Sequence, residues 1–558
     1  MRRSWPLAAA LVIAFVASSS AVAATTTIDP YGTVVLDGRK VFPIVLAKGP
    51  ERGAKTPDAT DALDEVVAAG VNVFKVGPAS RPWWPEDKAD AVAWNQEAAE
   101  RGAYTWVNLA TLADATPETP VKEARLREVI ALLRDDPALA LWKGADEPWW
   151  GPFDPPHLQY AYCVGTSRGN LDWCEGRPWA DSGHLWVTIQ APRGEASDLS
   201  PYSAVTDIHG VDHYPVTQTN PNPDLHEIGI WTDTIRSLTP NRAVWTTLQV
   251  CASGSGDGEA YVLPSRPQER YMIYDAIING ARSLAFYGGN IYRCWDDRDE
   301  ALGWNWHFWD DVLEELVREL NAVSPIAPAL VNPETTQVLA TSDPETQAIS
   351  RVGATSDDLW VIAARHGADP SPRPVMISGL PAWAANAAVY TESRSVTAGA
   401  GSLTDEFARW GVHVYHFRKP PPAPPPPAPP PAAPPAPPAP PPPPPPPPIV
   451  PSATPTSPPY VLVGRTLQAS TRAKAGRAFT IRLRVDTLTG PAQRASVGCS
   501  ARIGRKPLRP AAKRWTRGLA TCVWQLPKTS RGKLFRASIR VDSRGKTLTR
   551  SLTRRVSR

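Results

Sequence analysis

The stretch WKGADEPWWGP at residues 142–152 decides how the first half of the chain is interpreted. The apolar run PALALW at residues 137–142 leads into it, and two adjacent carboxylates, Asp146 and Glu147, stand before a proline and the pair Trp149-Trp150. A short apolar run bounded by turn residues is typical of a strand that is buried on both faces. The stretch therefore predicts a buried strand that ends in a site rich in acids and indole rings.

Eight runs of this kind punctuate the first 290 residues, and longer helical patterns lie between several of them. The runs occupy residues 41–47, 71–77, 104–109, 138–145, 184–190, 207–213, 243–250 and 283–287. The helical patterns occupy residues 58–69, 86–101, 120–134, 268–279 and 309–322. This alternation predicts an α/β fold, a (β/α)8 TIM barrel over residues 24–324. No convincing helical pattern separates the fourth and fifth runs, so we expect a remodelled loop there.

The chain begins with the features of a secretory signal peptide. Arg2 and Arg3 precede an apolar stretch at residues 7–16, and the small residues Ala21-Val22-Ala23 provide a cleavage signal. We expect residues 1–23 to be removed and the mature protein to be secreted, in association with the cell wall or free. No later segment is apolar and long enough to predict a membrane span after signal cleavage.

Six cysteines in an exported chain predict disulfides. Proximity along the chain suggests the pairs Cys163–Cys174, Cys251–Cys294 and Cys499–Cys522. The alternative, a zinc site, lacks support because no CxxC occurs. In a strand, His209 and His213 would lie about 13 Å apart, which is too far to share one metal. We expect no metal and no cofactor.

Three further regions follow the predicted barrel. Residues 325–419 lose the helical period and predict a small accessory β-sandwich. Residues 420–459 hold 27 of the 63 prolines, which predicts an extended polyproline linker of about 3.1 Å per residue. Residues 460–558 have strand patterns, a cysteine pair and Trp524, which we expect in the interior of an immunoglobulin-like sandwich.

The charge is distributed unevenly. Residues 460–558 hold 25 Lys and Arg against two acids, whereas the rest of the chain holds 34 basic and 53 acidic residues. Two interpretations of the basic domain stay open. It binds an anionic cell-wall polymer electrostatically, or its charge serves only solubility and export. No motif indicates a nucleic-acid partner.

The ends of the predicted strands carry the candidate site, because the active site of such a barrel lies where the strands end. The candidates, in order along the chain, are Trp83, Trp84, Asp146, Glu147, Trp149, Trp150, Asp212, His213, Tyr214, Gln249, Tyr287 and Trp295. Sugar rings pack their C–H faces on indole, and their hydroxyls bond to carboxylates and amides. This set predicts a carbohydrate substrate. Adjacent tryptophans cannot easily face one core, so at least one of each Trp pair should be exposed.

The order of four motifs carries a family resemblance. LWKGADEP, DIHGVDHYPV, AVWTTLQV and RPQERYMIYDAIINGARSLAFY follow one another as in secreted TIM-barrel glycoside hydrolases of the cellulase and β-galactosidase clan, which the chain resembles over residues 30–418. The C-terminal domain resembles immunoglobulin-like modules of secreted actinobacterial proteins. In the clan, the fourth strand ends in an Asn-Glu or Asp-Glu pair whose Glu is the acid/base. The resemblance implies that role for Glu147. The alternative is that Asp146 and Glu147 only complement a following helix.

The chain departs from the clan at its seventh strand, where the clan has a nucleophilic Glu and this sequence has Gln249. An amide cannot form the glycosyl-enzyme ester. Asp212 is the best second carboxylate; the loop acids Asp257 and Glu259 are alternatives, and the barrel could also lack a second acid. We interpret the neighbours Glu269 and Arg270 as a structural ion pair.

Three functions follow in order of support. The first is a secreted glycoside hydrolase that acts on poly- or oligosaccharide, with Glu147 and Asp212 as catalytic residues. The second is an inactive polysaccharide-binding or wall-associated protein. The third, a hydrolase of other esters or amides, lacks a GxSxG motif.

Overall fold

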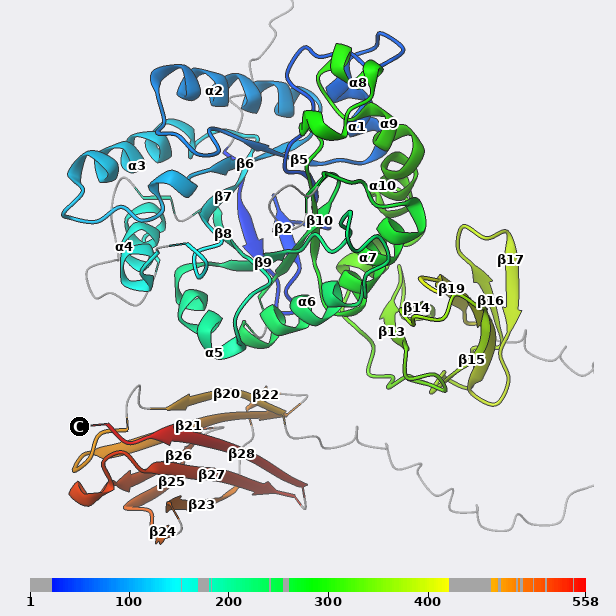
Figure 1. Ribbon diagram of the computed structural model, residues 1–558. Helices are drawn as coiled ribbons and strands as arrows, with labels where there is room; N and C mark the ends of the chain where they lie inside the picture. The colour runs from blue at the N-terminus through cyan, green and yellow to red at the C-terminus, as the bar shows by residue number, and fades with distance from the viewer. Residues whose placement is uncertain are drawn as a thin grey trace, which may run out of the picture. The chain divides into compact units, whose positions relative to one another are not determined.

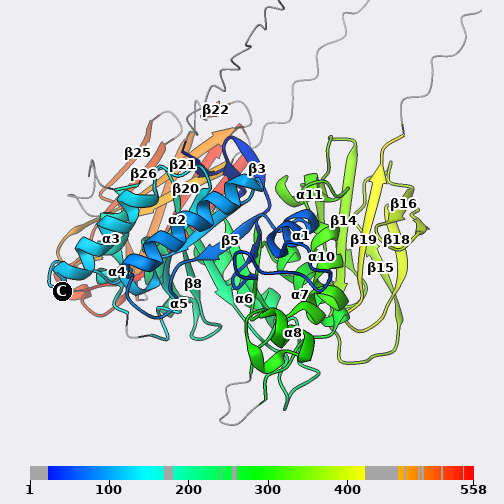
Figure 2. The same ribbon diagram turned by 90° about the horizontal axis from the view of Figure 1, so that it is seen from above.

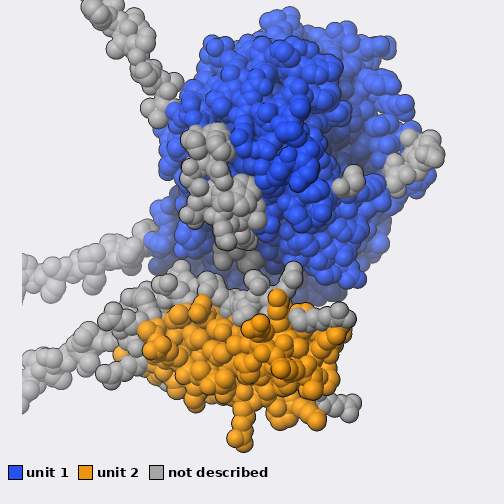
Figure 3. All heavy atoms as spheres, turned by 90° about the vertical axis from the view of Figure 1, so that its left-hand side faces the viewer, with its two compact units in different colours: residues 1–426 blue, residues 427–558 orange. Residues whose placement is uncertain are grey.

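The computed structural model describes residues 23–420 apart from 152, 169–179, 182, 240–241 and 254–259, and residues 463–557 apart from 470–472, 488–489, 492–494, 505, 517–518 and 545. The chain divides into two compact units, residues 1–426 and 427–558 (Figure 3). Residues 1–22 of the predicted signal peptide (1–23) and residues 421–459 of the predicted linker (420–459) lie outside the described residues. Each unit is described by itself.

The predicted barrel is confirmed. Eight strands close in the order β10-β11-β4-β5-β6-β7-β8-β9 (Figure 1), and every pair around the ring is parallel. Each strand coincides with one of the eight apolar runs. The strands are β4 (Ile44–Leu46), β5 (Val73–Val76), β6 (Tyr104–Asn108), β7 (Leu139–Asp146), β8 (Leu185–Gln190), β9 (Ile208–Asp212), β10 (Val244–Gln249) and β11 (Ser283–Tyr287).

Helices surround the barrel strands (Figure 1). The predicted ones are α1 (Ala62–Ala69), α2 (Pro85–Glu100), α3 (Pro120–Leu133), α7 (Arg266–Ile278) and the continuous pair η4 (Trp309–Leu313) and α10 (Glu314–Leu320). Others were not predicted: α5 (Ala196–Leu199), α6 (Glu227–Leu238), α8 (Asp297–Leu302), α9 (Trp306–Phe308) and α11 (Ala327–Val331). Each predicted helix has an apolar stripe that packs on the barrel, which is the condition for a stable surface helix.

The prediction that no helix separates the fourth and fifth strands is wrong. Helix α4 (Pro155–Thr166) lies there, with two prolines in its first turn, where a missing N–H is tolerated. Leu158, Ala161 and Tyr162 form its buried stripe, and the Tyr162 ring meets Trp186 edge-on, with 6.0 Å between centroids. The two prolines made this helix hard to recognise in the sequence, although its buried residues have the helical spacing.

A three-stranded antiparallel sheet closes the amino-terminal end of the barrel. It consists of β1 (Thr26–Ile28), β2 (Val34–Leu36) and β3 (Arg39–Val41). The Thr26 hydroxyl donates to the Ala140 carbonyl at the start of β7, at 2.5 Å. Val34 and Leu36 of β2 are buried in one cluster with the inward-facing barrel residues (Figure 1). The opposite, carboxyl end of the barrel is therefore the end that is open to a ligand.

Two antiparallel sheets follow the barrel, as predicted. One has the order β13-β14-β19-β16-β17 and the other β12-β15-β18. Their strands are β12 (Ala340–Thr341), β13 (Thr346–Val352), β14 (Asp358–Arg365), β15 (Arg373–Ser378), β16 (Asn386–Val389), β17 (Arg394–Thr397), β18 (Ser402–Phe407) and β19 (Val412–Arg418). Figure 2 shows β14 and β19 beside α7 and α10, and Trp360, Ile362 and Val414 are buried in the same cluster as the barrel helices. The five-stranded sheet and the barrel helices therefore share a core, and the residues between the two sheets form a cluster of their own.

The second unit is also built from antiparallel strands. One sheet has the order β20-β21-β26-β25, with β22 beside β21, and the other has the order β24-β23-β27-β28. The strands are β20 (Val463–Ala469), β21 (Ala478–Thr487), β22 (Gly490–Pro491), β23 (Ser496–Ile503), β24 (Lys506–Leu508), β25 (Ala512–Thr516), β26 (Leu519–Gln525), β27 (Leu534–Ser543) and β28 (Lys546–Arg555). Trp524 is fully buried between the sheets, as predicted. The Cys499–Cys522 disulfide, also predicted, joins them.

The disulfide predictions have a mixed outcome in the first unit. The Cys251–Cys294 bond is confirmed. Cys163 is disulfide-bonded, and Cys174, its predicted partner, lies outside the described residues. Among the described residues, no helix is long and apolar enough to cross a bilayer.

A substitution at Gly144 tests the packing inside β7. A Cβ at this position would come within 1.8 Å of Trp186 Nε1, so the indole has to move out of a close-packed interior. We expect Gly144→Ala to lower the free energy of unfolding by about 1–3 kcal/mol, measured as a lower melting temperature. The control is Gly399→Ala, where a Cβ meets nothing within 4 Å. Equal melting temperatures for the two variants would contradict this packing.

Candidate active site

A hollow of about 200 Å3 lies at the carboxyl ends of the barrel strands. Seven of the eight strands contribute a residue to its walls, and the eighth, β4, contributes Ala47, which follows it directly. The lining residues are Ala47, Lys75, Trp106, Lys143, Asp146, Glu147, Ile189, Asp212, Tyr214, Thr247 and Tyr287. The ring of strands therefore brings together residues that are up to 240 positions apart in the sequence.

Two carboxyl groups meet in this hollow. Asp212 ends β9, and its Oδ1 is buried without a hydrogen bond from an N–H or hydroxyl of the described residues. The Glu147 carboxyl lies within hydrogen-bonding reach of it. Two carboxyls at this range can bond only if one of them carries a proton. Glu147 and Asp212 are therefore placed to share one proton.

The surroundings of this pair favour the protonated form. Burial, followed by the charges of Glu147 and Asp146, raises the pKa of Asp212 well above its usual range. Burial, followed by the charge of Asp146, also raises the pKa of Glu147. The result is a carboxyl pair that keeps its proton to higher pH than free carboxyls do, as a general acid requires.

An ion pair keeps the third carboxylate, Asp146, in its ionised form. Lys143 lies in the same strand with its side chain only 2% exposed, and its Nζ is 2.5 Å from Asp146 Oδ1. Burial alone would raise the pKa of Asp146, but the positive charges of Lys143 and Lys75 lower it to about 2. Asp146 is therefore a permanent negative charge beside the protonated pair.

The interpretation of Asp146 as a cap for a following helix does not hold. The next helix, α4, begins at Pro155 and has Asp154 as its N-cap. Glu147 itself has a left-handed backbone, with φ of 45°. Such a conformation is strained for a residue with a side chain, and strained residues concentrate at functional sites.

Two tyrosines form one wall of the hollow. The rings of Tyr214 and Tyr287 are stacked, with 5.5 Å between centroids. The Tyr214 hydroxyl donates to Asp212 Oδ2 at 3.1 Å. This bond orients Asp212 and leaves its Oδ1 to face Glu147.

A second hollow, of about 500 Å3, adjoins the first and shares Glu147, Asp212 and Tyr214 with it. Trp150 and His213 also line it. Trp150 is 52% exposed. Its ring stacks on the Arg193 guanidinium at 3.4 Å, and His213 bonds through Nε2 to Glu227 at 2.9 Å. The carboxyl pair therefore lies where the two hollows meet.

The other predicted aromatic residues do not line either hollow. Trp83 is buried and donates through Nε1 to the Asn108 carbonyl at 3.0 Å. Trp84 is 45% exposed, with the Arg81 guanidinium 4.2 Å from its ring, and Trp149 is 36% exposed. Each Trp pair thus has at least one exposed member.

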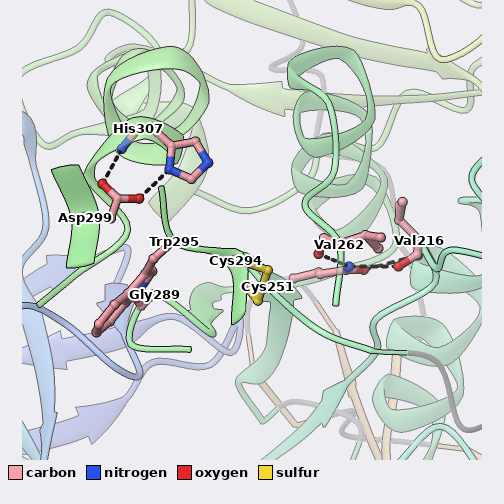
Figure 4. Close-up of a disulfide and its surroundings, with 9 residues drawn as sticks. Val216, Cys251, Val262, Gly289, Cys294, Trp295, Asp299 and His307 are labelled. Atoms are coloured by element: carbon pink, nitrogen blue, oxygen red, sulfur yellow. Dashed lines mark hydrogen bonds and ion pairs between the residues drawn. A yellow bond between two sulfur atoms is a disulfide. The ribbon is translucent and has the colours of Figure 1, made fainter. Parts of the chain in front are cut away.

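Trp295 lies near the Cys251–Cys294 disulfide (Figure 4), and Gln249 lies two residues before Cys251 in the chain. Gln249 is fully buried; its Nε2 donates to the Val216 carbonyl at 2.8 Å and its Oε1 accepts from the Val216 N–H at 3.1 Å. Trp295 donates to the Gly289 carbonyl at 3.2 Å (Figure 4). The amide of Gln249 therefore ties two loops together, and its side chain is not available to the hollow. The alternative acids Asp257 and Glu259 lie outside the described residues.

The interpretation of Glu269 and Arg270 as an ion pair is wrong. Arg270 pairs instead with Glu319, at 2.8 Å between Nη2 and Oε1. Both carboxyl oxygens of Glu269 are buried without a hydrogen bond to another described residue, and burial raises the pKa of Glu269 well above its usual range. Adjacent residues on a helix point in different directions, so the two side chains do not meet.

Six residues of the hollow were missed in the sequence: Ala47, Lys75, Trp106, Lys143, Ile189 and Thr247. A signal was present for the lysines, because each interrupts an apolar strand near its carboxyl end, in VFKV and LALWKGAD. A charged residue in a strand that is buried on both faces needs a partner or a ligand. That rule would have placed both lysines in the barrel mouth.

No family model matches the chain, and no curated protein sequence matches it. Solved structures align with its fold at low scores. An Anoxybacillus alpha-amylase is 10% identical, with a TM-score of 0.45 over 68% of this chain and 98% of that chain. A Geobacillus thermoleovorans alpha-amylase complexed with acarbose is 10% identical, with a TM-score of 0.42 over 68% of this chain and 98% of that chain. A Croceicoccus marinus glucosidase is 12% identical, with a TM-score of 0.39 over 71% of this chain and 99% of that chain. At these scores the likeness carries no argument about function.

The shared proton predicts a pH-dependent stability. The folded chain keeps a proton on Asp212 that the unfolded chain releases near pH 4, so rising pH favours unfolding. We expect Asp212→Asn to melt progressively higher relative to wild type as pH rises from 4 to 8, by about 1.4 kcal/mol for each unit of raised pKa. The measurement is the melting temperature across this pH range.

The control for this experiment is Asp58→Asn, at an exposed turn. Its melting temperature should keep a constant difference from wild type. If the Asp212→Asn difference is equally constant, the two carboxyls do not share a proton.

Proposed function

We propose that the barrel hydrolyses glycosidic bonds in a carbohydrate, with Glu147 and Asp212 as its acid/base pair. The observation that carries this proposal is the placement of two carboxyls with raised pKa values at the open end of the barrel, where two adjoining hollows meet. Glycoside hydrolysis needs a carboxylic acid that protonates the leaving oxygen and a carboxylate across the bond. A closed parallel barrel has its chemistry at this end.

The positions of the two carboxyls suggest their roles. Glu147 is half-buried and lines both hollows, so a sugar chain that extends from one hollow into the other passes beside it. Glu147 is therefore the general acid. Asp212 lies deeper and is held by Tyr214, which suits it to orient a water molecule or stabilise the developing positive charge. Trp150 offers an exposed ring to the sugar in the second hollow.

A second candidate function, binding of polysaccharide without cleavage, has one observation in its favour. Carboxyls within hydrogen-bonding reach are closer than the about 5–5.5 Å of retaining enzymes or the about 6.5–9.5 Å of inverting enzymes. Gln249 adds no carboxylate. Hydrolysis requires the pair to separate when the substrate enters, whereas binding does not.

We also propose that the protein is secreted and that its basic second unit holds it at an anionic wall polymer. The disulfides are compatible with export. On the second unit, Arg502 of β23 and Arg536 of β27 stand directly opposite each other. Like charges at this spacing repel, and an anionic polymer would relieve the repulsion.

Removal of the acid tests the hydrolase. Glu147→Gln keeps the shape of the side chain but cannot transfer a proton. We expect it to reduce the release of reducing ends from a panel of plant and microbial polysaccharides by about 10²–10⁴-fold. Asp58→Asn again provides the control and should keep wild-type activity.

The outcomes separate the two functions. Equal cleavage by wild type and Glu147→Gln would show that Glu147 is not the acid. If wild type cleaves nothing but is retained on an immobilised polysaccharide of the panel, the binding function replaces hydrolysis.

A charge-removal variant tests the wall anchor. We expect the double variant Arg502→Gln with Arg536→Gln to elute from immobilised teichoic acid at lower salt than wild type, because electrostatic binding weakens with charge and with ionic strength. The control, Arg39→Gln with Lys55→Gln, removes the same charge from exposed positions of the first unit. If both double variants elute alike, the arginine pair is not the contact.

A further inference from the structure

The rim of the smaller hollow has two halves that differ in what lies beyond them. On the side of β7, β8, β9 and β10 it adjoins the larger hollow, which is lined by residues that follow these four strands. They include Trp150 after β7, Arg193 after β8, His213 after β9 and Ser253 after β10. A ligand in the smaller hollow can therefore extend in this direction.

On the other half of the rim, a buried indole fills the space between the loops that follow β4 and β11. Trp304 is 2% exposed, and its Nε1 donates to the Lys48 carbonyl at 2.9 Å. A Cβ on Gly289 would come within 2.4 Å of the same nitrogen. Lys48 directly follows Ala47, a lining residue of the hollow. Gly289 lies two positions beyond Tyr287, another lining residue. Trp304 therefore packs directly beyond the wall of the hollow.

Trp83 fills the space between β5 and β6 in the same way. It is 1% exposed, and its Nε1 donates to the Asn108 carbonyl at the end of β6. A Cβ on Gly77, directly after β5, would come within 2.7 Å of its ring. Next to it, the buried Leu109 donates its N–H to the Lys143 carbonyl of β7 at 2.8 Å. Buried side chains therefore pack along the rim from β11 to β7, on the half of the ring away from the larger hollow.

The two hollows also differ in size. The smaller one has about 200 Å3 and the larger one about 500 Å3. Sites for drug-sized ligands have about 300–1,000 Å3, so the smaller hollow suits a single sugar ring and the larger one has room for more than one. Glu147 and Asp212 line both hollows. The bond that they are placed to cleave therefore lies at the boundary between the two.

We propose that the site removes the terminal residue from a sugar chain and does not cut inside the chain. This inference rests on the proposed function and names the part of the substrate on which it acts. The smaller hollow takes the terminal residue, and the larger hollow takes the residues that follow it. One water is consumed: its hydroxyl joins the anomeric carbon, and its proton replaces the one that Glu147 gives to the leaving oxygen.

Cleavage inside a chain needs room for sugar residues on both sides of the bond. A second sugar beyond the terminal position would have to displace Trp304 or Trp83, and both are buried and hydrogen-bonded. Displacement would expose the apolar surface of the indole and break its hydrogen bond, which is unfavourable. The chain therefore has to end in the smaller hollow.

Product analysis tests this inference on the full chain. Wild type is incubated with purified oligosaccharides from the polysaccharides of the panel that it cleaves, and the first products are identified by mass spectrometry. We expect the free monosaccharide together with the chain shortened by one residue. With the polymer itself, viscosity should stay nearly constant while reducing ends accumulate.

Two exposed aromatic residues test where the rest of the chain lies. Trp150 is 52% exposed and lines the larger hollow, whereas Tyr292 is 67% exposed and follows β11, on the packed half of the rim. We expect Trp150→Ala to raise the KM for oligosaccharides by about tenfold, because a sugar ring loses its stacking partner. The KM for a glycosyl fluoride of the terminal residue should not change, because this substrate places no sugar in the larger hollow. Tyr292→Ala is the matched control and should keep both KM values, and melting temperatures show whether each variant is folded.

Each other result overturns the inference. Chains of intermediate length among the first products, or a rapid fall in viscosity, would show cleavage inside the chain and leave the proposed function intact. A raised KM for oligosaccharides in Tyr292→Ala would place the chain across the packed half of the rim. An equal rise in the KM for the glycosyl fluoride in Trp150→Ala would place the terminal residue in the larger hollow. A wild type that cleaves no polysaccharide of the panel would refute the proposed function and the inference with it.

Discussion

The ion pair between Lys143 and Asp146 is the interaction on which the site depends. Lys143 is almost fully buried in a barrel strand, and such a charge is stable only beside a partner. The pair keeps Asp146 ionised, and burial, with the negative charge of Asp146 added to it, raises the pKa values of Glu147 and Asp212. The charge of Lys143 acts against these shifts, so burial and the charge of Asp146 together outweigh it.

The packing inside the barrel also strengthens the electrostatic interactions of the site. Its amino-terminal end is closed by the sheet β1-β2-β3, whose Val34 and Leu36 fill the interior. Trp106 and Trp245 form the next layer, and the charged groups stand above them. Apolar layers below a polar mouth lower the local dielectric, which strengthens every charge interaction in the hollow.

Much of the fold could be predicted because strand and helix periods are local. All eight barrel strands coincide with apolar runs, and two disulfides join the expected cysteines. The wrong predictions also have local causes. The prolines of α4 concealed a helical stripe, and the adjacent position of Glu269 and Arg270 suggested a contact that helix geometry forbids. The partner of Arg270, Glu319, lies 49 residues away, and periodicity carries no information about such a distance.

The sequence by itself determined the order of strands and the residues that end them, because a barrel strand must be apolar until it reaches the mouth. It therefore located Asp146, Glu147, Asp212 and Tyr214. Only the tertiary structure decided which of these groups meet. Closure of the ring brings Glu147 against Asp212 and places Lys75 over the ring of Trp106, while Gln249 turns into the protein to bond with Val216. Protonation states and unpaired charges depend on distances across the ring, and those distances exist only when the barrel is closed.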